Sequence, residues 1–332
     1  MPTHCNLWRQ TMRIALVFGL MVTFLVPALG ARAASGTVNV FYAGSLVSLN
    51  ENLIGPAFAS ASGYTYAGQS GGSGAIANEI KGKIAQPDVV EFADPAVNKT
   101  LMGSANGTYV SWYLTYARSE LVIGFDPKSP VAKEFVAVQR HKLPFYKALE
   151  QKGLRIGRTD PQIDPKGYRA IWMARLTQKV YHQQGFEKRL FGANENSSQV
   201  FPEQTLVARM LTGQVNAGIF YLSEVRELGI PYITLPARVN LGSTKEKDAK
   251  LYATQHFTLP TGQRVTGAPI EYTITIPSTV QNPAGAQAFV RFVLSRRVRA
   301  ISAAHGLLPL KTTVGGDKSA VPSSLTGLIG KK

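Results

Sequence analysis

The feature that most constrains the fold of this chain is an alternation of short strand-type and helix-type apolar patterns. Strand patterns occur in residues 37–42, 88–92, 120–125, 154–157, 217–221 and 272–276. Helical patterns lie between them, in residues 74–84, 164–182, 206–211 and 283–294; Ile76, Ile80 and Ile84, for example, share one helical face. This alternation predicts an α/β fold with mixed, mainly parallel sheets that carry helices on both faces.

A leader segment precedes the first predicted strand. Arg9 and Arg13 come before an apolar run over residues 14–29, and Ala31-Arg32-Ala33 follows it. A positive start, a short apolar stretch and a small-residue site together indicate a cleaved secretory signal peptide. The apolar run, at about 16 residues, is short for a membrane anchor. We therefore expect residues 1–33 to be removed and the protein to reach the periplasm.

Composition narrows the chemistry and the partners. Cleavage of the leader removes Cys5, the only cysteine among 332 residues, which excludes disulfides, thiol catalysis and cysteine-bound metals in the mature chain. The formal net charge of +16 is compatible with nucleic acid, a membrane surface or a small anion as partner. The basic residues are dispersed and lack the basic and aromatic pattern of nucleic-acid modules. We therefore expect no nucleic-acid partner.

Small and polar residues gather at three predicted helix starts: Ala43-Gly44-Ser45, Gly71-Gly72-Ser73-Gly74 and Asp164-Pro165-Lys166-Gly167-Tyr168. Unpaired N–H groups, the positive end of the helix dipole and a hydroxyl can together bind a small oxyanion. Taken singly, each start has the pattern of an ordinary N-cap, and Asp164 before Pro165 fits that pattern well. An anion site follows only if the three starts converge.

Several of these segments, in the same order, resemble the molybdate/tungstate-binding proteins of ABC importers. Residues 41–46, Gly72-Ser73 and residues 88–94 resemble their first lobe, and residues 116–123 resemble the crossing into the second lobe. Residues 157–161, Asp164-Pro165 and Gly167-Tyr168-Arg169 resemble the tungstate-type branch, and residues 217–221 and 269–277 complete the order. The resemblance implies a two-lobed, type II-like periplasmic binding protein fold with a ligand cleft between the lobes.

This fold divides the chain into a first lobe of residues 35–116 and 270–332 and a second lobe of residues 117–269. The segment from Val321 is rich in Ser, Gly and Lys, so we expect it to be frayed.

The resemblance also implies a function. The protein would capture molybdate or tungstate, deliver it to the membrane permease of an ABC transporter, and act as a monomer without a cofactor and without catalysis. Carried over by position, the anion-binding residues are Ser45, Ser73, Asp164, Gly167, Tyr168 and Tyr221.

Asp164 poses an electrostatic problem at such a site. In the tungstate-type branch two carboxylates approach the metal; Asp164 stands at one position, but Phe220 occupies the other. We therefore expect a four-coordinate oxyanion held by hydrogen bonds. An ionised Asp164 facing a dianion would be repelled by roughly 4 kcal/mol at ~4 Å and an effective dielectric near 20. We expect Asp164 to cap its helix, with the N–H groups of Gly167 and Tyr168 facing the anion. The alternatives are that Asp164 binds a protonated oxygen of the ligand or contacts the metal directly.

Two other functions remain open from the sequence. One is a receptor for another tetrahedral oxyanion such as sulfate, and the other is an exported hydrolase or phosphatase. Ser45 lacks the G-x-S-x-G context of a hydrolase nucleophile. A cleft that offers only donors would reject phosphate, because the O–H of a protonated phosphate would have no acceptor.

Overall fold

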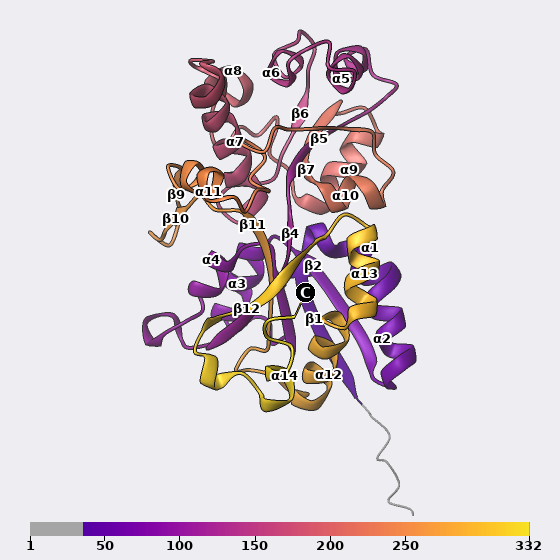
Figure 1. Ribbon diagram of the computed structural model, residues 1–332, viewed down its shortest axis with the longest axis vertical. Coiled ribbons are helices and arrows are strands. Elements are labelled where there is room, and N and C mark those ends of the chain that lie inside the picture. The colour runs from indigo at the N-terminus through magenta and orange to yellow at the C-terminus, as the bar shows by residue number, and fades with distance from the viewer. Residues whose placement is uncertain (1–35, 332) are drawn as a thin grey trace, which may run out of the picture. The chain divides into compact units, whose positions relative to one another are not determined.

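The structure, a computed structural model, describes residues 36–331 (Figure 1). The predicted signal peptide, residues 1–33, lies outside the described residues, as does Cys5. Between residues 36 and 331 no helix is both long enough and apolar enough to cross a lipid bilayer. All of the predicted site residues fall within the described range.

The larger main sheet contains six strands, which are β1 (Thr37–Ala43), β2 (Thr65–Gly71), β3 (Val89–Phe92), β4 (Trp112–Ser119), β11 (Ile270–Thr275) and β12 (Leu308–Gly316). Their order across the sheet is β12-β4-β11-β3-β1-β2. β1 pairs in parallel with both neighbours, so that Val40 lies beside Gly68 on one side and Val89 on the other. β11 and β12 run antiparallel to their neighbours.

The smaller main sheet has the order β6-β7-β5-β8. Its strands are β5 (Leu121–Phe125), β6 (Ile156–Gly157), β7 (Ala217–Tyr221) and β8 (Tyr232–Thr234). A separate hairpin contains β9 (His256–Thr258) and β10 (Arg264–Thr266). Only Glu120 separates β4 of the larger sheet from β5 of the smaller one.

Both main sheets are mixed, but the prediction that they are mainly parallel is wrong. Among the described strands of these two sheets, three pairings are parallel and five are antiparallel. The reason is the chain path: β4 carries the chain out of the larger sheet and β11 brings it back, so the two run in opposite directions. Parallel neighbours instead require a crossover connection, such as the helical stretch between β1 and β2.

Helices cover both faces of the larger sheet (Figure 1). A continuous helical stretch over residues 44–62 follows β1 and contains α1 (Val47–Leu49), a π-helical turn and α2 (Gly55–Ser62). The others are α3 (Ser73–Lys81), α4 (Pro95–Lys99), α12 (Pro283–Val293), α13 (Arg296–Ala304) and α14 (Ser323–Thr326). Because side chains alternate along a strand, Val89 of β3 belongs to the core that contains Phe58 and Phe289, whereas the next residue, Val90, belongs to another core with Ile76 and Ile80.

The helices associated with the smaller sheet are α5 (Ala132–Gln139), α6 (Phe145–Ala148), α7 (Pro165–Tyr181), α8 (Phe186–Phe191), α9 (Glu203–Leu211), α10 (Leu222–Glu227) and α11 (Glu246–Tyr252). α7 agrees with the predicted helix over residues 164–182. Asp164 is its N-cap and Pro165 its first residue, and His182 ends it in the left-handed conformation with φ 55°.

The prediction that the chain frays from Val321 onward is wrong for the described residues. Val321 and Leu325 are 5% and 0% exposed and belong to the main core. The backbone after α14 returns to β12, since the Thr312 N–H donates to the Lys331 carbonyl at 2.8 Å and the Gly330 N–H donates to Thr312 at 2.9 Å. The two apolar side chains anchor a segment whose overall composition is polar.

Candidate functional site

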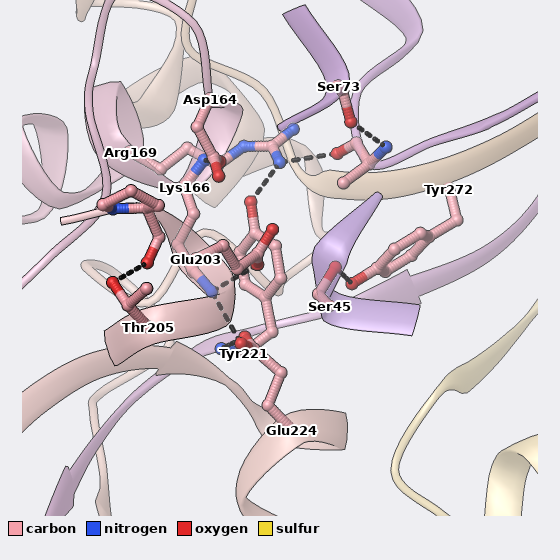
Figure 2. A network of polar contacts seen from close by, with 12 residues as sticks. Ser45, Ser73, Asp164, Lys166, Arg169, Glu203, Thr205, Tyr221, Glu224 and Tyr272 are labelled. Atoms are coloured by element: carbon pink, nitrogen blue, oxygen red, sulfur yellow. Dashed lines mark hydrogen bonds and ion pairs between the residues drawn. The ribbon is translucent and has the colours of Figure 1, made fainter. Parts of the chain in front are cut away.

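The three helix starts singled out from the sequence come together in the structure (Figure 2). The start of α3 lies against the residue before Asp164: the Ala75 N–H donates to the Ile163 carbonyl at 3.2 Å. A Cβ at Gly74 would lie 2.7 Å from that same oxygen, so the close approach requires glycine there. The backbone at Gly44 lies against the carboxylate of Glu203, the first residue of α9.

Ser45 and Ser73 are both buried, at 3% and 1% exposed. The Tyr272 hydroxyl donates to Ser45 Oγ at 2.8 Å, and the Ala93 N–H donates to Ser73 Oγ at 3.1 Å. Each serine oxygen therefore accepts a hydrogen bond from the protein. A hydroxyl that accepts in this way still has its own hydrogen to donate.

Arg169 of α7 lies at the centre of the polar network (Figure 2). Its Nη1 donates to the Ala93 carbonyl at 2.6 Å and to the Tyr221 hydroxyl at 2.7 Å, and its Nη2 donates to Asp94 at 2.8 Å. The Tyr168 hydroxyl also donates to Asp94, at 2.6 Å. α7 is thereby joined to the loop between β3 and α4.

Arg169 stays charged although it is buried. Burial acts to lower the pKa of its guanidinium, but Tyr221 and Asp94 raise that pKa above its usual value. Tyr221 therefore accepts from a cation, and a hydroxyl that accepts in this way can still donate its own hydrogen. Burial raises the pKa of the Tyr221 hydroxyl, so it keeps that hydrogen at neutral pH.

A second buried cation, Lys166, lies beside two carboxylates. Its Nζ is 2.5 Å from Glu203 Oε1 and 2.6 Å from Glu224 Oε1. Burial acts to lower the pKa of Lys166, but the two glutamates raise it above the ordinary value. Burial also raises the pKa of Glu224, to about 7. The cluster therefore holds a fixed positive charge beside Glu224, which gains a proton more readily than an exposed glutamate does.

Asp164 caps α7, as expected from the sequence. Its Oδ1 accepts from the Lys166 N–H at 2.8 Å, and burial, followed by the charge of Glu203, raises its pKa well above the usual value. The Gly167 N–H donates to the Asp164 carbonyl at 3.0 Å, so this donor is already used within the helix. Gly167 has a steric role, because a Cβ there would lie 2.5 Å from the Asp160 carbonyl carbon and the Pro161 nitrogen. Tyr168 contributes its side chain to Asp94.

Sequence reasoning missed Lys166, Glu203 and Glu224 as members of the site. Lys166 was visible only as part of the third helix start, and the two glutamates follow no motif. The expectation of a cleft that offers only donors is wrong, because Asp164, Glu203 and Glu224 bring acceptors to it. In residues 36–331 no group of three or more His, Cys, Asp or Glu side chains is arranged to hold a metal ion.

Comparison with known proteins identifies the family. Residues 38–308 match the family model described as bacterial extracellular solute-binding protein. The chain belongs to this family. A solute-binding protein of Petrotoga mobilis is 30% identical over 319 residues, which cover 94% of this chain and 96% of the relative. A Pyrococcus abyssi relative named molybdate/tungstate-binding protein WtpA is 26% identical over 257 residues, or 71% of this chain and 72% of that protein.

Solved structures show the fold of this solute-binding protein. The periplasmic molybdate-binding protein of Azotobacter vinelandii superimposes with a TM-score of 0.56 at 19% identity, covering 82% of this chain and 98% of that one. The two main sheets therefore belong to the two-lobed fold of periplasmic binding proteins, as predicted.

Proposed function

We propose that this protein is an exported receptor that captures molybdate or tungstate between its two lobes and delivers it to the permease of an ABC transporter. It acts by binding, without catalysis and without a cofactor. The family match and the printed names of its relatives support the class of ligand. The signal-peptide pattern of residues 1–33 supports export to the periplasm.

One observation carries the proposal: three buried hydroxyls at the converging loops each accept a hydrogen bond from the protein and keep a hydrogen for a guest. The donors to them are Tyr272 for Ser45, Ala93 N–H for Ser73 and Arg169 for Tyr221. A fully deprotonated tetrahedral anion accepts at every oxygen, so it matches a set of fixed donors. Hydrogen bonds to a charged group contribute ~1.5–3 kcal/mol each.

The carboxyl groups at the site change the expected selectivity. An ionised carboxylate is an acceptor for a protonated phosphate oxygen, so a phosphate is not rejected for want of an acceptor. The size and the charge of each anion must then determine which anion the site binds most tightly. Phosphate therefore belongs in the binding test beside molybdate, tungstate and sulfate.

Titration calorimetry of the mature chain with these four anions tests the ligand. We expect molybdate or tungstate to bind with micromolar or tighter affinity and the other two to bind more weakly. Sulfate or phosphate binding as tightly as the oxometalates would overturn the ligand assignment. Turnover of phosphate or sulfate esters that is lost in Ser45→Ala would instead establish the exported hydrolase.

Two substitutions test the hydroxyl donors. Ser73→Ala and Tyr221→Phe are each expected to weaken molybdate binding by about 1–2 kcal/mol, because each removes one donated hydrogen bond. In Tyr221→Phe, Arg169 keeps its hydrogen bonds to Ala93 and Asp94, so we expect this variant to remain folded. Ser104→Ala, at an exposed serine, and Tyr64→Phe are the controls. Unchanged affinity in both test variants would show that the anion does not bind at Ser73 and Tyr221.

A further inference from the structure

The carboxylate of Glu203 lies where a small anion at the first helix start would lie. A Cβ added to Gly44 would meet Glu203 Oε2 at 2.1 Å, so the carboxylate rests directly on the backbone between β1 and the helical stretch that follows it. The Glu203 side chain is only 7% exposed. Its other oxygen, Oε1, is paired with the buried Lys166 at 2.5 Å.

The charges around Glu203 oppose the binding of an anion while the Glu203 carboxylate remains in place. Lys166 is the cation paired with it, and that cation is already shared with Glu224 at 2.6 Å. Burial, followed by the charge of Glu203, raises the pKa of the nearby Asp164. A dianion placed at Gly44 and Ser45 would meet the Glu203 carboxylate at short range, where like charges in a dry site repel strongly.

The structure also provides a place into which the side chain can withdraw. A cavity of about 220 Å³ adjoins Glu203 and is lined by Gly44, Ser45, Ser70 and Glu224, among other residues. A glutamate side chain is far smaller than this volume. Rotation of Glu203 into the cavity would uncover the Gly44 backbone and release Lys166.

We propose that Glu203 is an internal competitor of the oxyanion. Its carboxylate holds the place beside Gly44, and an incoming anion displaces it and takes over Lys166 as its counter-ion. The inference rests on the proposed function and adds an affinity-determining residue to it. Such a competitor weakens binding by the free energy needed to move it, because the guest must replace the interactions that the Glu203 carboxylate already makes.

Glu203→Gln tests the competitor in the full mature chain, with molybdate as the probe. The amide keeps the size of the side chain and an oxygen that can accept from Lys166, but it lacks the charge. We expect at least tenfold tighter binding by titration calorimetry. Glu203→Ser, which also empties the place beside Gly44, is the second variant and should likewise bind more tightly.

Glu195→Gln is the matched control, because Glu195 is an exposed carboxylate on the segment that leads to α9. It removes the same charge away from Gly44 and should leave the affinity unchanged. Equal or weaker binding in both Glu203 variants, with thermal unfolding showing that they are folded, would overturn the inference. Absence of molybdate binding in the wild type and in every variant would instead overturn the proposed function.

Discussion

At the scale of single residues, Glu227 shows how burial at this site couples stability to pH. It lines the same cavity as Ser45 and Glu224, and burial raises the pKa of its carboxyl group from 4.5 to about 7. The folded protein therefore holds this proton more tightly than the unfolded chain does. The contribution to stability is complete below about pH 4.5 and is lost as the pH rises to about 7.

Glu227→Gln removes this loss, because glutamine cannot ionise. We expect the variant to match the wild type at pH 5 and to exceed it at pH 8 by about 1–2 kcal/mol in the free energy of unfolding, after allowance for partial exposure. Urea unfolding at the two pH values measures the difference. A variant that is equally or less stable at pH 8 would show that Glu227 is not held in a raised-pKa environment.

The residue scale also marks the limit of the sequence-based prediction of the site. Ser45 and Ser73 could be singled out because each follows a glycine at a helix start. Glu203 and Glu224 could not, because their importance comes from Lys166, which lies 37 and 58 residues away along the chain. A buried ion cluster of this kind has no local pattern.

At the scale of elements, the start of α4 joins two parts of the molecule. Asp94 Oδ1 caps α4 by accepting from the Ala96 N–H at 2.8 Å, while Oδ2 accepts from Arg169 and Tyr168 of α7. The Asp-Pro pair predicts the cap from the sequence alone. The link to α7 could not be predicted, because Tyr168 and Arg169 lie 74 and 75 residues from Asp94 along the chain and no local pattern relates them.

Asp94→Asn separates these two roles. Asparagine keeps an oxygen for the cap but removes the charge opposite Arg169, so we expect a loss of about 3–5 kcal/mol in the free energy of unfolding, as for a broken buried ion pair. Chemical denaturation measures it. The control is Glu246→Gln, whose partner Lys250 is 75% exposed, and it should change stability by less than about 0.5 kcal/mol. Equal effects of the two substitutions would contradict the role assigned to Asp94.

At the scale of the whole molecule, alternating patterns predicted an α/β fold and the resemblance predicted two lobes, and both predictions are confirmed. Two predictions are wrong: that the sheets are mainly parallel, and that the segment from Val321 onward is frayed. Strand direction depends on the path of the chain, which leaves the larger sheet at β4 and returns at β11. No local sequence pattern predicts such a path. The final segment looked frayed because Val321 and Leu325 are diluted among polar residues.

Truncation after Ala320 tests the anchoring of that segment. It removes two buried apolar side chains, each of which stabilises the fold by about 1.5–3 kcal/mol. We expect the melting temperature of the truncated chain to fall by several degrees in differential scanning calorimetry. Leu325→Ala in the intact chain should reproduce part of the loss, whereas Leu228→Ala, at a side chain that is 46% exposed, should not. An unchanged melting temperature after truncation would show that the segment from Val321 onward does not stabilise the fold.

The single residue between β4 and β5 has a mechanical consequence. The smaller sheet and its helices are joined to the larger sheet through Glu120 and through the return segment that leads to β11, so a torsional change at Glu120 that the return segment follows would rotate them as one body. The displacement produced by such a rotation increases with distance from Glu120. It would therefore be largest at the loop between α5 and α6, at the far end of the smaller sheet (Figure 1).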